Sequence, residues 1–311
     1  MGAVDLAIEV RGLEKRYRGK RGVHALRGVD LGVARGEIYG LLGRNGAGKT
    51  TLVKILLDIV RASAGSAALL GEPSRAVHAR RRVGYLPEDH RFPDYQTGLS
   101  AMEFYARLSD VSRVERKRRV PELLELVGLK DAAARKVRGY SKGMKQRLGL
   151  AQALVHDPAV LFLDEPTDGV DPVGRAEIRD VLLRVRGEGR TIFLNSHLLS
   201  EVEQICDRVG ILEAGRLARE GTIEELTRVS GAWKLELDRE ADVAMQERLR
   251  AHALRVATHG RELHLEVAEE AALDRCVDLL REQRYGLRGL SGGRASLEQV
   301  FLATVEEEVR S

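Results

Sequence analysis

The sequence predicts an α/β protein with two domains, and three features support this fold class. Strand-like and helix-like segments alternate through most of the first 229 residues, which is typical of a mostly parallel sheet covered by helices. A glycine-rich loop at residues 43–50 lies between a predicted strand and a predicted helix. A second apolar strand, residues 160–163, ends in two carboxylates. We expect residues 1–229 to form the larger domain and residues 230–311 a smaller one.

The larger domain is predicted to begin with two antiparallel strands, because residues 29–33 alternate between apolar and polar. A buried strand then leads into the glycine loop, and a helix follows the loop. A helical region at about residues 99–154 is inserted before the carboxylate strand, with a helix stop at Gly128. The expected elements are strands 8–17, 26–33, 37–42, 83–86, 160–163 and 191–194, and helices 50–59, 121–127, 175–186 and 199–206.

The smaller domain is predicted to follow the order β-α-β-β-α-β of a ferredoxin-like α+β unit. Residues 233–237 alternate as a strand, and a hairpin is expected across His259-Gly260. Ser296 and Gln299 form a predicted capping pair for a closing helix. The remaining expected elements are helices 243–253, 270–283 and 296–308 and strands 254–258, 261–267 and 285–290.

Composition indicates a soluble globular protein that acts from the cytoplasm. Of 311 residues, 43% are hydrophobic and 32% are charged. The apolar runs are too short to cross a bilayer, and the N-terminus lacks the apolar core of a signal peptide. The net charge is +4, with basic clusters at 80–82 and 116–119. We interpret these as solvated helix faces, with contact to anionic lipid or RNA as the alternative. The two cysteines, Cys206 and Cys276, are expected to be reduced and buried.

The glycine loop matches the pattern G-x-x-x-x-G-K-[ST] in the context that this pattern requires. Glycines allow successive backbone N–H groups to point at a phosphate, and the following helix adds its positive end. Lys49 is expected to reach the β- and γ-phosphates, and the Thr50 hydroxyl to ligate Mg²⁺. The predicted nucleotide-contacting residues are Gly43, Arg44, Asn45, Gly46, Ala47, Gly48, Lys49, Thr50 and Thr51.

Asp164 and Glu165 end the second buried strand and precede the segment Pro166–Asp171. We expect Asp164 to hold the Mg²⁺ ligand shell and Glu165 to act as the general base toward the attacking water.

Together with residues 140–147, Tyr-Ser-Lys-Gly-Met-Lys-Gln-Arg, these motifs resemble the ATPase subunits of ABC transporters over about residues 5–228. In that family the segment at 140–147 contacts the ATP that is held by the opposite subunit. Ser141 and Gly143 match this contact in trans, and Met144 is at the third contact position. Tyr140, Lys142 and Met144 depart from the usual L-S-G-G-Q, where Met144 replaces the glutamine. Residues 290–294 fit that pattern better, but they follow the carboxylate strand, and we interpret them as a loop before the last helix.

The resemblance implies roles for four further residues. Tyr17 matches an aromatic residue that stacks on adenine, and Glu88 matches a glutamine that contacts Mg²⁺ and the membrane subunit. Asp171 matches a residue of the loop that crosses the dimer interface, in trans to the nucleotide. His197, in Asn195-Ser196-His197, matches a catalytic histidine that contacts the γ-phosphate. The implied Mg²⁺ ligands are therefore Thr50, Glu88 and Asp164.

The resemblance implies an ATPase with a P-loop ABC domain, which consists of a RecA-like sheet, an antiparallel β subdomain and a helical subdomain. It implies ATP and Mg²⁺ as cofactors, a homodimer around two ATP molecules, and a separate membrane permease of an exporter. The subunit itself is then expected in the cytoplasm, on the inner face of the membrane. No nucleic-acid partner is expected. The alternatives are a non-transport ABC ATPase of translation or DNA repair, or a regulatory ATP-binding module. A single glycine loop and the absence of a long coiled-coil insertion argue against the former, and the presence of Lys49, Glu165 and His197 argues against the latter.

Overall fold

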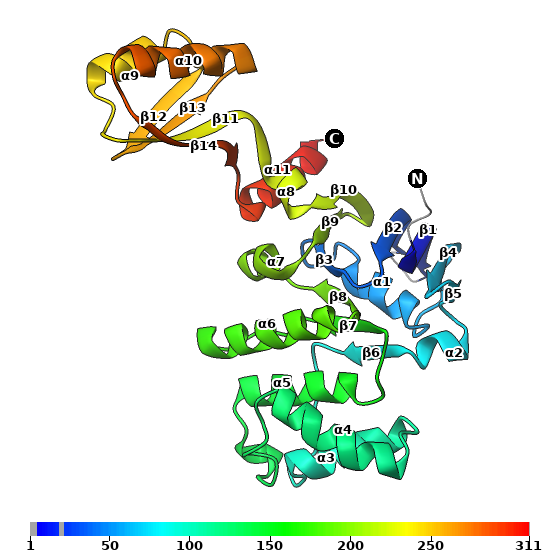
Figure 1. Ribbon diagram of the computed structural model, residues 1–311. Coiled ribbons are helices and arrows are strands. Elements are labelled where there is room, and N and C mark those ends of the chain that lie inside the picture. Colours follow the sequence, from blue (N-terminus) through cyan, green and yellow to red (C-terminus); the bar gives the residue numbers. More distant parts are fainter. Residues whose placement is uncertain (1–4, 19–21, 311) are drawn as a thin grey trace. The chain divides into compact units, whose positions relative to one another are not determined.

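The computed structural model describes residues 5–18 and 22–310, which form two compact units (Figure 1). The first unit contains the residues up to Ile223 together with those from Ala303 onward, and the second contains Glu224–Leu302. The domain boundary expected at 229/230 falls just inside strand β11 (Arg228–Leu237). No helix in the described ranges is long and apolar enough to cross a membrane.

The centre of the first unit is a six-stranded sheet in the order β10-β9-β3-β8-β7-β6. The strands from β9 to β6 are parallel, and only β10 pairs antiparallel. The central strands β3, β7 and β8 are buried at every residue, as expected for a sheet covered on both faces. The strands are β3 (Ile38–Leu42), β6 (Val83–Leu86), β7 (Val160–Asp164), β8 (Thr191–Asn195), β9 (Arg208–Glu213) and β10 (Arg216–Thr222).

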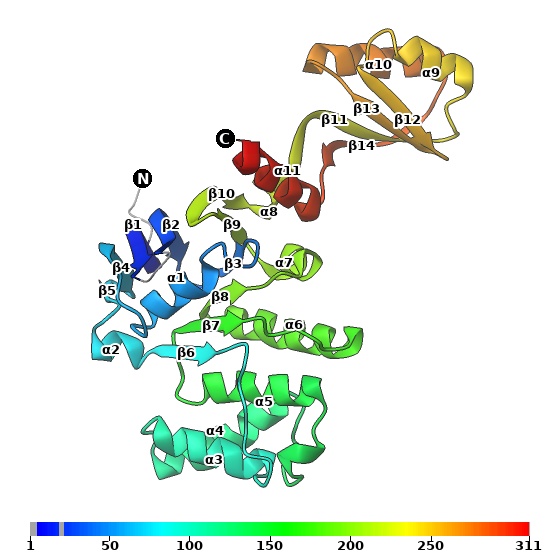
Figure 2. The ribbon, with the colours of Figure 1, turned by 180° about the vertical axis from the view of Figure 1, so that it is seen from behind.

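Helices cover the two faces of this sheet, as the views from front and back show (Figure 2). Tyr39 and Leu41 on β3 pack in one core cluster with α1 (Lys49–Leu56) and the antiparallel sheet. Between them, Gly40 faces α7 (Leu199–Ile205), where an added Cβ would lie 2.9 Å from Val202. The alternation of side chains along β3 therefore places α1 and α7 on opposite faces. Helix α6 (Pro172–Gly187) connects β7 to β8.

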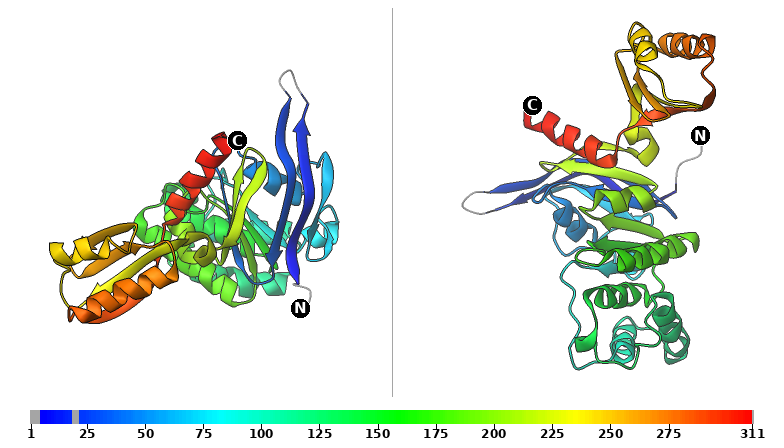
Figure 3. Two further views of the ribbon diagram at one scale, coloured as in Figure 1. Left: turned by 90° about the horizontal axis from the view of Figure 1, so that it is seen from above. Right: turned by 90° about the vertical axis from the view of Figure 1, so that its left-hand side faces the viewer.

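An antiparallel sheet in the order β2-β1-β4-β5 packs on the α1 side. Its long ribbon of β1 (Leu6–Tyr17) and β2 (Val23–Ala34) is seen most clearly from above (Figure 3, left). The other members are β4 (Ala64–Leu69) and β5 (Glu72–Pro73), and a short helix α2 (Val77–Arg80) follows. The two antiparallel strands expected near the N-terminus are confirmed.

The helical insertion consists of α3 (Gly98–Leu108), α4 (Arg113–Leu126), a 3₁₀ turn η1 (Val137–Gly139) and α5 (Lys142–Leu154). Capping boxes at Thr97/Ser100 and Ser112/Glu115 begin α3 and α4. Arg119 turns inward and donates to the Leu154 and Val155 carbonyls. This part of the basic cluster at 116–119 is therefore structural, rather than the solvated face that we expected.

The second unit contains one four-stranded antiparallel sheet in the order β12-β13-β11-β14. Helices α9 (Val243–Leu249) and α10 (Glu270–Glu282) cover one face (Figure 3, right) and bury a core that includes Leu235, Leu263 and the free thiol of Cys276. The strands are β11, β12 (Arg255–His259), β13 (Glu262–Glu266) and β14 (Leu287–Arg294). Along the chain α8 (Ile223–Thr227) precedes them and α11 (Leu297–Arg310) follows them, and α11 continues into the first unit from Ala303. Ser296 and Gln299 make the predicted reciprocal cap of α11.

Two sequence interpretations differ from the structure. Residues 290–294 are not a loop but part of strand β14, where Ser291 pairs with Lys234 and Gly292 with Trp233. The lack of a side chain at Gly293 allows this pairing, because a Cβ there would lie 2.5 Å from Ala232. The hairpin of β9 and β10 at residues 208–222 was assigned no strands from the sequence, although β9 completes the parallel part of the sheet.

Candidate functional site

The glycine loop joins β3 to α1 and has a conformation that depends on its glycines. Gly48 has φ of 111°, and a Cβ there would lie 2.5 Å from the Ala25 carbonyl oxygen on β2. A Cβ on Gly43 would lie 2.3 Å from the Leu212 carbonyl oxygen on β9. The loop is thus enclosed between two strands in a shape that other residues would not tolerate.

Lys49 occupies the first position of α1, and its amine folds back over the loop. Its Nζ donates to the Gly43 carbonyl at 2.5 Å and to the Arg44 carbonyl at 3.2 Å. Arg44, Asn45 and Gly46 are exposed, whereas Ala47, Gly48 and Lys49 are buried. The ammonium therefore lies over the backbone of the loop, which is exposed to solvent at residues 44–46 and buried at residues 47–49.

Three neighbouring parallel strands end at this edge of the sheet. The loop follows β3, the two carboxylates follow β7, and Asn195 with His197 follows β8 between them. In register, Asn195 is opposite both Asp164 and Leu41. Because the carboxyl ends of adjacent parallel strands meet at one edge, residues far apart in the sequence converge here.

Asp164 is buried and is held by one side chain. The Asn195 Nδ2 amide donates to its Oδ1 at 2.5 Å. Burial raises the pKa of Asp164, the Asn195 hydrogen bond opposes that rise, and the charges of Glu88 and Glu165 add to it. A buried carboxylate among other carboxylates is an environment that a divalent cation would stabilise.

Glu165 has a left-handed backbone, with φ of 51°, and is only 8% exposed. Its N–H donates to the Asn195 carbonyl at 2.8 Å. Its Oε2 lies 2.8 Å from His197 Nδ1 and accepts from the His197 N–H at 3.3 Å. The structure therefore brings together the two residues for which a catalytic role was predicted, with the carboxylate fixed and the imidazole half exposed.

Burial lowers the pKa of Lys49, while the surrounding carboxylates, first Glu165 and Asp164, oppose that shift. Glu88 is exposed after β6, but its charge acts on both Lys49 and Asp164. Its carboxylate therefore lies close enough to influence both groups electrostatically.

The residues present fit a nucleotide phosphate with a magnesium ion. Backbone N–H groups of the loop and the Lys49 ammonium could bind a phosphate, and Thr50, the next residue, is exposed. Among the described residues, no group of three or more His, Cys, Asp or Glu side chains forms a metal cluster. A cation here would depend on one hydroxyl, one or two carboxylates and oxygens of the nucleotide itself.

Other predicted residues lie at the borders of this site. Tyr17 ends β1 and is 38% exposed, with Lys15 Nζ 4.9 Å from the centroid of its ring. Thr51 is half-buried in the first turn of α1.

The residues predicted to act in trans gather at the N-termini of α5 and α6. Ser141 caps α5 by accepting from the Met144 N–H at 3.2 Å, and Asp171 caps α6 by accepting from the Gly174 N–H at 2.8 Å. Gly143 lies against Val170, where a Cβ would be 3.2 Å from the valine side chain. Lys142 Nζ binds Asp168 Oδ2 at 2.8 Å. Ser141 and Asp171 thus lie at the two helix N-termini that are joined by contacts to the segment after Glu165.

Two residues of the site were missed by sequence reasoning. Asn195 holds Asp164 and Glu165, and Gln146 donates from α5 to the Glu165 carbonyl at 3.2 Å. Their contacts depend on strand register and helix packing, and no local sequence motif predicts the role of Asn195 or of Gln146.

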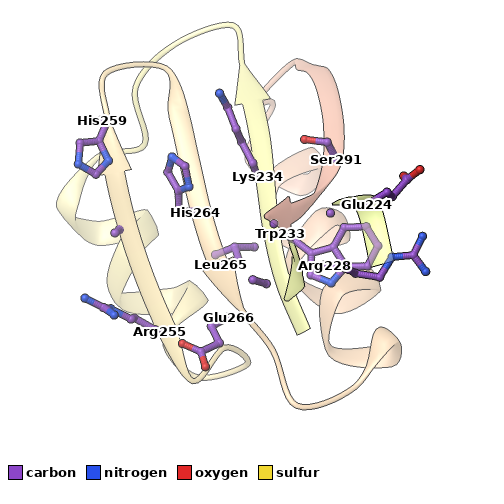
Figure 4. Close-up of a pocket in the computed structure, with 14 residues that line it drawn as sticks. Glu224, Arg228, Trp233, Lys234, Arg255, His259, His264, Leu265, Glu266 and Ser291 are labelled. Carbon is purple, nitrogen blue, oxygen red and sulfur yellow. The ribbon is translucent and has the colours of Figure 1, made fainter. Parts of the chain in front are cut away.

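The second unit has a separate hollow of about 720 Å³ on the sheet face that α9 and α10 leave open (Figure 4). Two of its side chains contact Glu262 on β13: Lys234 Nζ lies at 2.6 Å and His264 Nε2 at 3.6 Å. Arg255 is paired in register with Glu266. This is the polar outer face expected of an antiparallel sheet with one buried side.

Comparisons with known proteins agree with the site in the first unit. The model of the family described as "ABC transporter" matches residues 26–168. An uncharacterized ABC transporter ATP-binding protein of Nostoc is 50% identical over 206 residues, which are 66% of this chain and 62% of that protein. A daunorubicin resistance ATP-binding protein of Streptomyces coeruleorubidus is 38% identical over 98% of both chains, and a Nod factor export ATP-binding protein of Burkholderia orbicola is 39% identical over 97% of this chain and 98% of its own.

Among solved structures, an ATP-binding subunit of an ABC transporter superposes with a TM-score of 0.64 at 29% identity, over 71% of this chain and 91% of its own. The mixed sheet and the antiparallel sheet of the first unit therefore form the nucleotide-binding cassette fold.

Proposed function

Because this chain belongs to the family of ABC transporter ATP-binding proteins, we propose that it binds ATP with Mg²⁺ and hydrolyses it to drive a separate membrane permease. The observation that carries the proposal is the convergence of Lys49, Asp164, Glu165 and His197 at the ends of β3, β7 and β8. A phosphate cradle, a cation-holding carboxylate, a base and an imidazole are the groups that phosphoryl transfer to water requires.

In the proposed reaction, the oxygen of a water molecule forms a bond to the γ-phosphorus while the bond from that phosphorus to the bridging oxygen of ADP breaks. Glu165 accepts the proton of the water, and its contact with His197 Nδ1 at 2.8 Å orients the carboxylate for this transfer. Lys49 holds the β- and γ-phosphates through its ammonium. Thr50 and Asp164, with Glu88 at the edge, would hold Mg²⁺, which neutralises charge on the phosphates.

Steady-state hydrolysis of ATP by the full chain tests this function. We expect Lys49→Ala to lose ATP binding, and Glu165→Gln to bind ATP but to hydrolyse it roughly 10²-fold more slowly or worse. Lys54→Ala, in the last turn of the same helix, is the matched control and should behave as the wild type. Hydrolysis by Glu165→Gln at the wild-type rate would show that the base is wrongly assigned.

We further propose that two copies enclose two ATP molecules, each contacted in trans by Ser141, Gly143, Met144 and Asp171. The support is their placement at two helix N-termini, where backbone N–H groups and the helix dipole favour an anion. Tyr17 and residues 43–51 would contact the nucleotide in cis.

The proposed permease contact lies on the helical insertion. Phe104 and Leu108 are exposed one turn apart on α3. Edge-to-face ring contacts run from Phe104 through Tyr105 and Phe92 to His90, two residues after Glu88. An exposed apolar tip joined to the nucleotide site fits a membrane subunit, so we place the protein on the inner face of the membrane. The names of two relatives, in drug resistance and Nod factor export, favour an exporter.

We propose that the second unit, Glu224–Leu302, is the ferredoxin-like accessory domain that the sequence predicts at residues 230–311. The order β11-α9-β12-β13-α10-β14 and the antiparallel sheet β12-β13-β11-β14 support this assignment.

A further inference from the structure

We propose that Gln146 is a positioning residue that transmits movement of helix α5 to the candidate base Glu165. The inference rests on the proposed function and extends it, because Gln146 would make the reactivity of one site depend on what binds at the N-terminus of α5. Four observations support this role: the backbone of Glu165, the clamp on its peptide groups, the burial of Gln146, and the attachments of α5.

The backbone of Glu165 needs external support. Its φ of 51° lies in the left-handed region, which side-chain-bearing residues rarely adopt and which persists only where the surroundings impose it. The direction of the carboxylate depends on this backbone, because the side chain leaves from the same Cα.

The two peptide groups of Glu165 are held from opposite elements. Its N–H donates to the Asn195 carbonyl on β8 at 2.8 Å. Its carbonyl accepts from Gln146 Nε2 on α5 at 3.2 Å. The first support belongs to the buried parallel sheet, whereas the second belongs to the helical insertion. Displacement of α5 relative to the sheet would therefore change only one of the two supports.

Gln146 is 4% exposed, and its Oε1 has no hydrogen-bond partner in the described part of the chain. A buried amide with one unpaired atom costs stability compared with an apolar side chain of similar volume. The opposite orientation of the amide would point Oε1 at the Glu165 carbonyl, where two acceptors would repel each other. The Nε2 donor of Gln146 is therefore the group that holds the Glu165 carbonyl, whereas its Oε1 makes no hydrogen bond in the described residues.

Two further contacts attach the first turn of α5 to the segment after Glu165. Lys142 binds Asp168 at 2.8 Å, and the missing side chain of Gly143 lets Val170 approach. Ser141 caps the same turn. A phosphate that binds at Ser141 and Gly143 would therefore shift a turn already joined to the catalytic segment, and Gln146, one turn further along, would carry that shift to Glu165.

The test compares full-length Gln146→Met with wild type, with Glu165→Gln and with Gln152→Met, a half-buried glutamine of the same helix. Methionine removes the donor and keeps the volume. We expect Gln146→Met to lower kcat about 10-fold or more, with KM for ATP within about twofold and a melting temperature that is not lowered, because the unpaired buried amide oxygen is removed. We also expect it to accumulate as an ATP-bound dimer, whereas Gln152→Met should match the wild type. Gln146→Glu, which places an acceptor against the Glu165 carbonyl, should lower kcat further.

A wild-type kcat for Gln146→Met, or a joint loss of melting temperature, KM and dimer, would overturn the inference in favour of a packing role. These outcomes differ from failure of the proposed function, in which the wild type itself would not hydrolyse ATP or Glu165→Gln would remain active.

Discussion

Replacing Gly48 by alanine tests whether the glycine loop must keep its present shape to bind a nucleotide. Two costs follow from the structure. A φ of 111° is unfavourable for alanine, which costs about 1–3 kcal/mol. The new Cβ would also meet the Ala25 carbonyl oxygen at 2.5 Å and Leu26 Cδ2 at 2.9 Å, and forcing atoms into a packed site costs about 1–3 kcal/mol more.

The sum of about 2–6 kcal/mol must appear either as lost stability or as lost affinity. If the loop keeps its shape, the melting temperature should fall by at least about 4 °C. If the loop relaxes, the cradle is lost, and 2 kcal/mol corresponds to roughly a 30-fold weaker Kd. Thermal unfolding and titration with a fluorescent ATP analogue measure the two losses on the same sample.

Two glycines separate the contributions. Gly46 has φ of 87°, but no atom lies within 4 Å of a Cβ added there. Gly46→Ala should therefore show only the free-energy cost of the unfavourable backbone angle. Gly187→Ala, at the end of α6, has neither a positive φ nor a neighbour within 4 Å, so it should be neutral or slightly stabilising. If Gly48→Ala matched Gly187→Ala in both measurements, the reasoning about the loop would be refuted.

Three further predictions address other parts of the molecule. Ser141→Arg should abolish hydrolysis, because it removes the cap of α5 and places a bulky side chain at the proposed phosphate contact; full activity of the mutant homodimer would contradict the two-site arrangement. His156→Gln should flatten the fall in melting temperature between about pH 7 and pH 5. Burial lowers the pKa of His156 in the folded protein. The neutral imidazole therefore contributes its full stabilisation above the unfolded pKa of about 6.5, and this is lost as the pH falls through the folded pKa. Identical slopes of melting temperature against pH for wild type and variant would contradict this. Glu88→Gln should keep activity but need more Mg²⁺ for half-maximal hydrolysis, because a carboxylate holds Mg²⁺ more strongly than an amide; superimposable titration curves would remove Glu88 from the ligand set.

The parts of the site that the sequence predicts are those whose chemistry is local. The glycine loop can be predicted because its backbone conformation requires particular residues within eight consecutive positions. The carboxylates after β7 are predictable because an apolar run must end where the chain leaves the core. The cap of α11 by Ser296 and Gln299 is equally local, and the structure confirms it.

The parts that were missed depend on tertiary contacts. The role of Asn195 follows from its register with Asp164, and that of Gln146 from the packing of α5 beside β6, which brings its amide to the Glu165 carbonyl. Residues 290–294, the last part of strand β14, are predicted as a glycine-rich loop, although pairing with β11 overrides that local preference. The short hairpin at 208–222 likewise gains its strand character from the neighbouring β3.

The central claim is that one chain supplies a complete catalytic half-site and shares ATP with a second copy. The most direct measurement is the mass of Glu165→Gln by size-exclusion chromatography with light scattering, with and without ATP and Mg²⁺. The account predicts a monomer near 34.4 kDa without nucleotide and a stable dimer of twice that mass with ATP. A variant that binds ATP yet stays monomeric, and that hydrolyses ATP at nearly the wild-type rate, would contradict the account.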